Sequence, residues 1–173
     1  MQAVENKPQF QSDRAVSVTN SAENSTALFE PGLHVVSRTQ LRERCVDPFV
    51  QSATRLDLTT RLFQLLDWIE SFGVKSEAWV DGSYTTSKVD PRDVDLVIFI
   101  DRGDIELLTD SVYAEFLQIQ DRALIKARYN SDVYVDPLGD SDRSKYWRSK
   151  FGSDDRTNLS KGIAVIKLDG STH

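Results

Sequence analysis

The sequence has few of the residues that build cross-linked or zinc-dependent proteins. Its 173 residues include one cysteine, Cys45, and two histidines, His34 and His173. A single cysteine excludes an internal disulfide framework and is compatible with a reducing compartment. Both histidines are distant in sequence from the main acidic motif of the chain, so we expect no zinc site.

Long apolar runs are also lacking. No stretch is long enough to span a bilayer, and residues 1–6 do not have the basic-then-apolar build of a signal peptide. We therefore expect a cytoplasmic protein with no membrane partner. With 39% hydrophobic residues, a chain of this length can bury one good core, which predicts a single domain.

Positive charge is the third shortage. The chain has 21 Lys and Arg against 27 Asp and Glu, a net charge of −6, which argues against tight, sequence-independent binding to a nucleic acid backbone. Residues 1–30 are polar, with too few large apolar groups to offset the entropy of ordering. We expect a flexible arm over 1–30, a single domain over 31–173, and a protein partner rather than a long nucleic acid.

The most informative motif is a Gly-Ser turn followed by two acids. Gly82 and Ser83 are separated by residues 84–92 from Asp93 and Asp95, which open an apolar strand. Because side chains alternate along a strand, both acids point to one face. Their mutual repulsion would be relieved by Mg²⁺ or Mn²⁺, which prefer oxygen ligands. The alternative is a solvated acidic start to an edge strand.

The turn itself is suited to phosphate. Gly82 allows the backbone to approach a ligand closely, and the Ser83 hydroxyl with neighbouring N–H groups can bind phosphate oxygens. The alternative is that Ser83 is a helix N-cap, a position that can also bind phosphate. Lys88 and Arg92 are near enough in sequence to meet the same anion, but such residues are more often plain loop charges. Together with the acids, the turn predicts a site for a nucleoside triphosphate and divalent metal.

The order of these elements separates the motif from other Asp-x-Asp sites. In haloacid-dehalogenase-type phosphatases and many sugar transferases an apolar strand runs into the acids, whereas here the acids come first. The pattern resembles the nucleotidyltransferase fold of the DNA polymerase beta superfamily. The chain is similar to the short, free-standing nucleotidyltransferase-like proteins of prokaryotes and phages. Matching segments are residues 31–34, 132–137, 146–152 and 161–163.

The resemblance assigns roles residue by residue. It implies that Gly82 and Ser83 form the phosphate-binding turn and that Asp93 and Asp95 bind metal. It also implies a third carboxylate on a later strand, which would help to activate the incoming hydroxyl. Asp132 is the first choice and Asp136 the second, because both lie on one strand face. A sizeable helical domain after this carboxylate, common in the superfamily, is missing.

The predicted fold is α/β of the α+β type, a small mixed sheet with helices mainly on one face. Periodicity and breakers predict helices over 39–44, from 48 to about 72, 110–129 and 141–150, and strands over 78–81, 93–101, 132–136 and 163–168. Trp147, beside Tyr146 and Phe151, is interpreted as core rather than as a base-stacking residue.

Two functions follow from the resemblance. The first is a Mg²⁺-dependent nucleotidyltransferase that moves a nucleoside monophosphate from a nucleoside triphosphate to a hydroxyl of an RNA, a protein or a small molecule, in a toxin–antitoxin or phage-defence system. The second is a protein-interaction module on the same fold, with weak or absent catalysis. Neither the acceptor nor the preferred base can be read from the sequence.

Overall fold

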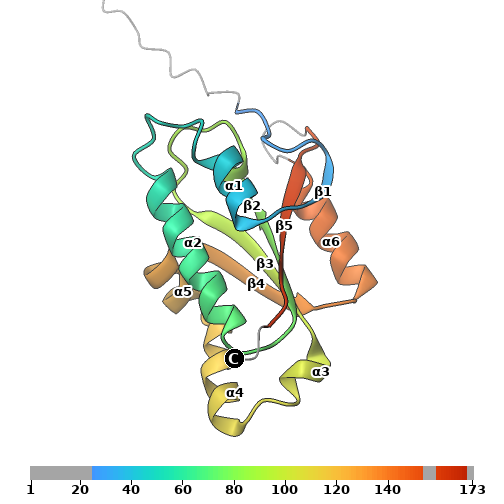
Figure 1. Cartoon of the computed structure of the whole chain (residues 1–173). Coiled ribbons are helices and arrows are strands. Elements are labelled where there is room, and N and C mark those ends of the chain that lie inside the picture. Colours follow the sequence, from blue (N-terminus) through green and yellow to red (C-terminus); the bar gives the residue numbers. More distant parts are fainter. Residues whose placement is uncertain (1–24, 154–158, 171–173) are drawn as a thin grey trace, which may run out of the picture.

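A mixed β-sheet forms the centre of the molecule in the computed structural model, which describes residues 25–153 and 159–170 (Figure 1). Its strands are β1 (Gly32–Val35), β2 (Ser76–Asp81), β3 (Val94–Ile100), β4 (Ser131–Pro137) and β5 (Gly162–Leu168). They lie in the order β1-β5-β2-β3-β4. β3 runs parallel to β4, and β1 runs parallel to β5, while β2 is antiparallel to both of its neighbours. The prediction of a small mixed sheet is confirmed.

Helices cover the two faces unequally. They are α1 (Arg38–Cys45), α2 (Arg55–Glu70), α3 (Arg102–Ile105), α4 (Asp110–Phe116), α5 (Arg122–Tyr129) and α6 (Ser141–Phe151), with 3₁₀ turns η1 (Gly82–Thr85) and η2 (Leu117–Gln120). Figure 1 shows α1, α2 and α5 on one side of the sheet and α6 on the other. The expectation of helices mainly on one face is therefore confirmed.

The alternation of β3 sorts its side chains between these two layers. Leu96 and Ile98 belong to the larger core under α2 and α5, whereas Val97 and Phe99 join a smaller cluster with Trp147 of α6. All five are buried, and each fully buried side chain of this size stabilises the fold by about 1.5–3 kcal/mol. Asp95, the acid within β3, consequently faces the α6 side, and Asp93 lies just before the strand.

Two predicted helices differ from the structure. The helix expected over 110–129 is divided, because Asp121 leaves helical geometry and its side chain accepts a hydrogen bond from the N–H of Leu124 at 3.0 Å. Such local side-chain bonds compete with helix continuation and start a new helix instead. The long helix begins at Arg55 rather than at residue 48. The edge strand β1 was not predicted, since four residues give too short a pattern.

The predicted boundary between the arm and the domain, after residue 30, lies too far along the chain. Phe29 is only 2% exposed and belongs to the main core. Leu28 N–H donates to the carbonyl of Thr85 at 2.9 Å, and Ser87 N–H donates to the carbonyl of Thr26 at 2.7 Å. Residues 26–29 therefore belong to the domain and lie along the loop after η1. The remainder of the predicted arm, residues 1–24, lies outside the described residues.

None of the helices in the described ranges is long and apolar enough to cross a bilayer.

Candidate functional site

Three aspartates from neighbouring strands form a row across the sheet. In the strand register, Asp81 of β2 pairs with Asp95 of β3, and Asp95 pairs with Asp132 of β4. Paired residues place their side chains on the same face, here the face covered by α6. The register thus sets Asp95 beside Asp132, 37 positions later in the sequence, as predicted.

The same register separates the two candidates for the third carboxylate. Asp136 pairs with Phe99, further along the sheet than Asp95. Its oxygens accept two hydrogen bonds from Arg143 at 2.8 Å each and one from Trp147 Nε1. Burial favours the neutral acid, but these hydrogen bonds outweigh it and hold the pKa of Asp136 below its usual range. Asp136 therefore anchors α6, and Asp132 is the acid beside Asp95.

A lysine lies between two of the acids. Lys126 Nζ, from α5, is 2.5 Å from Asp93 Oδ2 and 2.5 Å from Asp132 Oδ2. Burial acts to lower the pKa of Lys126, yet its hydrogen bonds to Asp132 and Asp93 raise the pKa overall, so the amine is an ammonium. The structure thus joins Asp93 to Asp132 through a shared cation. Sequence reasoning missed Lys126, because nothing in a helical pattern shows which acids a lysine will reach.

The electrostatic environment of Asp95 favours a compensating cation. Burial raises the pKa of this carboxyl, and the negative charges of Asp93 and Asp132 raise it further. A cation bound by these groups would relieve both effects, since opposite charge stabilises the ionised form.

Gly82 packs directly against Asp95. Its φ is +82°, a left-handed conformation that favours glycine, and a Cβ built there would lie 2.0 Å from Asp95 Oδ2. Both the conformation and the lack of space require glycine at this position. The sequence predicts a close approach of this turn to a ligand; in the structure the close neighbour of Gly82 is Asp95, the carboxylate that the sequence placed in the same site.

The loop after the turn is held by a buried arginine, Arg55, the first residue of α2. All five of its N–H donors reach carbonyl oxygens, namely those of Cys45, Tyr84, Thr86, Lys88 and Val89 at 2.6–3.2 Å. Arg55 is fully buried, and burial lowers its pKa. Its guanidinium also lies 3.7 Å from the centre of the Phe49 ring. This side chain, which sequence analysis did not identify, fixes the backbone from 84 to 89.

A second charged pair lies at the end of β2. Lys161 Nζ is 3.0 Å from Asp81 Oδ2, and both side chains are nearly buried. Burial raises the pKa of Asp81 to about 6, an effect that the attraction of Lys161 reduces without cancelling. Sequence analysis gave neither residue a role, and only the pairing of β2 with β3 connects them to the acidic row.

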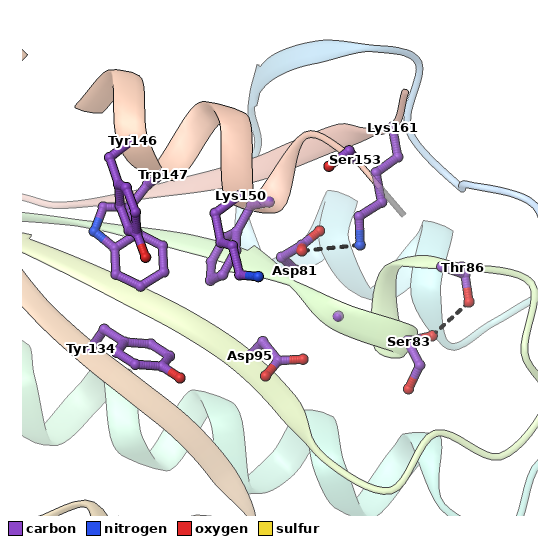
Figure 2. A pocket seen from close by; sticks show the side chains of 12 residues that line it. Asp81, Ser83, Thr86, Asp95, Tyr134, Tyr146, Trp147, Lys150, Ser153 and Lys161 are labelled. Carbon is purple, nitrogen blue, oxygen red and sulfur yellow. Dashed lines mark hydrogen bonds and ion pairs between the residues drawn. The ribbon is translucent and has the colours of Figure 1, made fainter. Parts of the chain in front are cut away.

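A cavity of about 380 Å³ opens beside this row (Figure 2). It is lined by Asp81, Gly82, Ser83, Thr86, Asp95, Tyr134, Tyr146, Trp147, Lys150, Phe151, Ser153 and Lys161. Of the predicted site residues, Gly82, Ser83 and Asp95 are in this lining. Asp93 and Asp132 are outside this lining: Asp132 is the strand partner of the lining residue Asp95, and Lys126 joins Asp132 to Asp93. Lys88 does not belong to the described lining, and its carbonyl is engaged by Arg55.

The acids can be compared with what a metal site requires. Within residues 25–153 and 159–170, no group of three or more His, Cys, Asp or Glu side chains is arranged to hold a metal ion. The Lys126 ammonium lies between Asp93 and Asp132. The donors are nevertheless carboxylate oxygens, as Mg²⁺ prefers, and the charge repulsion at Asp95 fits a site for a divalent cation. A metal ion held by Asp93 and Asp132 would take the place of this ammonium.

Comparison with known proteins identifies a family. A model described as "Family of unknown function (DUF6932)" matches residues 21–167, and the chain belongs to that family. Neither a curated protein nor a solved structure matches the chain.

Proposed function

We propose that this member of a family of unknown function is a Mg²⁺-dependent nucleotidyltransferase. The observation that carries the proposal is the convergence of the predicted elements: Gly82 packs on Asp95, and Asp95 pairs with Asp132 in the strand register. Gly82, Asp95 and Asp132, which the sequence pattern singles out, are thus neighbours in space. The reaction would move a nucleoside monophosphate from a nucleoside triphosphate to an acceptor hydroxyl on an RNA, a protein or a small molecule.

Each group has a role in this reaction. Asp93, Asp95 and Asp132 would hold Mg²⁺ or Mn²⁺, which supplies neutralisation of phosphate charge and activation of the acceptor hydroxyl. The Ser83 hydroxyl and the N–H groups of the Gly82 turn would bind phosphate oxygens. The acceptor oxygen forms a bond to the α-phosphorus, the bond to pyrophosphate breaks, and Asp132 takes the hydroxyl proton. Positioning and electrostatics account for catalysis without a covalent intermediate.

Lys126 favours a second candidate function. The Lys126 ammonium already neutralises Asp93 and Asp132. A non-catalytic domain would need such a cation, because without a metal ion the two carboxylates would otherwise repel each other and destabilise the fold. In that case the chain is a protein-interaction module, such as the regulatory partner in a toxin–antitoxin or phage-defence pair. The two candidate functions differ in two respects: whether the acids bind a metal ion, and whether the protein converts a substrate.

The test is the substitution Asp95→Asn. Because burial and like charges disfavour the Asp95 carboxylate, the amide should leave the protein as stable as wild type or more stable. Mg²⁺-dependent transfer of label from an α-labelled nucleoside triphosphate, onto total RNA or a co-purified protein, should fall by at least 100-fold, roughly the loss of one key transition-state contact.

Asp57→Asn is the matched control. Asp57 has an exposed side chain on α2, paired with Arg61 four residues later, so label transfer by this variant should equal that of wild type. If wild type transfers no label with any of the four triphosphates, the nucleotidyltransferase proposal is rejected. An Asp95→Asn protein that transfers label as well as wild type would reject the assigned site.

A further inference from the structure

The cavity beside the acids has two chemically different ends. Ser83, Thr86 and Asp95 form a polar end next to the Gly82 turn, and Tyr134, Tyr146 and Trp147 form an aromatic end against α6 (Figure 2). The polar end accounts for the phosphates and metal of the proposed reaction. That reaction gives no role to the aromatic end.

The aromatic end is held rigid by Asp136. One carboxylate binds Arg143 twice, at 2.8 Å each, and also binds Trp147 Nε1. The Trp147 ring lies 4.8 Å from the Tyr134 ring and 5.1 Å from the Tyr146 ring, centre to centre. A surface that is already fixed loses little conformational entropy when a ligand binds to it.

Tyr146 offers the accessible part of this end. Trp147 is only 4% exposed and belongs to the core, as the sequence predicted, whereas Tyr146 is 49% exposed and still lines the cavity. The Arg143 guanidinium lies 4.8 Å from the centre of the Tyr146 ring. A large aromatic ring that is exposed at the mouth of a concave site is suited to stacking on a flat ligand.

Lys150 connects the two ends. It follows Tyr146 by one helical turn on α6, so both side chains project from the same side of the helix. Lys150 lines the same cavity, and Figure 2 shows its side chain directed toward Asp95. A positive charge at this place lies between the aromatic end and the acids, where the phosphates of a nucleotide would pass.

We propose that the aromatic end of this cavity binds the base of a nucleoside triphosphate, with Tyr146 as the stacking residue. This assignment rests on the proposed function, which requires a triphosphate at the Gly82 turn. It adds the direction in which the nucleotide lies: the base against Tyr146 on α6, and the phosphates past Lys150 toward Ser83 and Asp95. Because stacking accepts any base, nucleoside triphosphates as a class should bind better than inorganic tripolyphosphate.

The test compares ATP with inorganic tripolyphosphate by equilibrium titration of the full chain in Mg²⁺. Wild type should bind ATP at least about fivefold more tightly than tripolyphosphate, the factor that corresponds to the lower end of the stacking energy of one base. Tyr146→Ala should remove this preference and leave the affinity for tripolyphosphate unchanged. Tyr146→Phe should keep the preference, because the ring remains. Tyr113→Ala, which removes a half-exposed tyrosine of α4 outside the cavity, should bind as wild type.

The outcomes separate this inference from the proposed function. If ATP and tripolyphosphate bind equally well, or if Tyr146→Ala keeps the preference for ATP or weakens both ligands equally, the base site is wrong while the triphosphate site stands. If wild type binds neither ligand, both proposals are rejected. Loss of the ATP preference in Tyr146→Ala alone supports the base site.

Discussion

At the scale of single residues, the pair Asp81–Lys161 shows how burial competes with charge. The two side chains are 5% and 10% exposed and 3.0 Å apart. A buried ion pair of this kind seldom gains more than it loses by desolvation. At Asp81 the effect of burial is larger than the attraction of Lys161, and the pKa of this carboxyl is raised to about 6. The pair stands at one end of the acidic row, so its charge state affects the field at Asp95.

This raised pKa predicts how stability depends on pH. Asp81 binds its proton more tightly in the folded protein than in the unfolded chain, where the pKa is about 3.9. Its contribution to stability is therefore present below pH 4 and is lost as the pH rises through 6. A shift of two units corresponds to about 3 kcal/mol. The difference in unfolding free energy between wild type and Asp81→Asn, measured with urea, should change by about 2 kcal/mol between pH 4 and pH 7, because the unfolded carboxyl is already about half ionised at pH 4.

The comparison between variants isolates Asp81 from the other acids that titrate in this range. Asp142→Asn is a suitable control, because the Asp142 side chain is 90% exposed. Its difference from wild type should be constant with pH. A constant difference for Asp81→Asn as well would contradict the assignment of a raised pKa to this group.

At the scale of elements, α2 supports the site through its first residue. Arg55 binds the carbonyl oxygens of Tyr84, Thr86 and Lys88, which follow the Gly-Ser turn. The loop between β2 and β3 has little regular structure of its own beyond η1. One side chain of a neighbouring helix therefore satisfies several backbone groups that would otherwise lack partners.

Arg55→Met should consequently disturb both stability and binding. It leaves buried carbonyl groups without donors, and each such group costs about 1–3 kcal/mol. We expect a loss of at least about 3 kcal/mol in unfolding free energy, and a weaker affinity for tripolyphosphate under conditions where the variant is folded. Arg61→Lys on the same helix, at a half-exposed position, should change stability by at most about 0.5 kcal/mol. Equal stability of the two variants would show that Arg55 does not hold the loop.

At the scale of the whole molecule, Lys126 and a metal ion compete for the same acids. Lys126 reaches Asp93 and Asp132 from α5, which packs on the face of the sheet opposite α6. A ligand that binds only the folded state raises its stability according to concentration and affinity. At 100 times its dissociation constant, Mg²⁺ should stabilise the protein by about 2.7 kcal/mol, raising the thermal midpoint by roughly 5–10 °C.

Lys126→Met should enlarge this effect. Without the ammonium, Asp93 and Asp132 repel each other, so the thermal midpoint in EDTA should fall below that of wild type. Added Mg²⁺ or Mn²⁺ should then produce a larger rise than in wild type, since no lysine has to be displaced. Lys145→Met, at an exposed position on α6, should respond as wild type does. A midpoint that neither ion changes, in wild type or in Lys126→Met, would contradict the metal site.

Much of the fold was predictable because it depends on local patterns. Strand alternation predicts one face for the acids, and in the structure Leu96 and Ile98 of β3 lie in the core on the face opposite Asp95. Predictions were wrong where a local cap or a tertiary contact overrode the pattern. Asp121 divides a helix that apolar spacing alone would continue. Phe29 is buried in the core, although the polar composition of residues 1–30 predicted a flexible arm.

For the candidate site, the sequence by itself determined the chemical types and their faces. Gly82, Ser83, Asp93 and Asp95 lie within 14 residues, so strand periodicity and glycine conformation were enough to group them. Only the tertiary structure placed Asp132, and not Asp136, beside Asp95, and only it showed the contacts of Arg55, Lys126 and Lys161. The physical reason is that periodicity is a property of neighbouring residues, whereas strand register and long-range ion pairs depend on how the whole chain closes on itself.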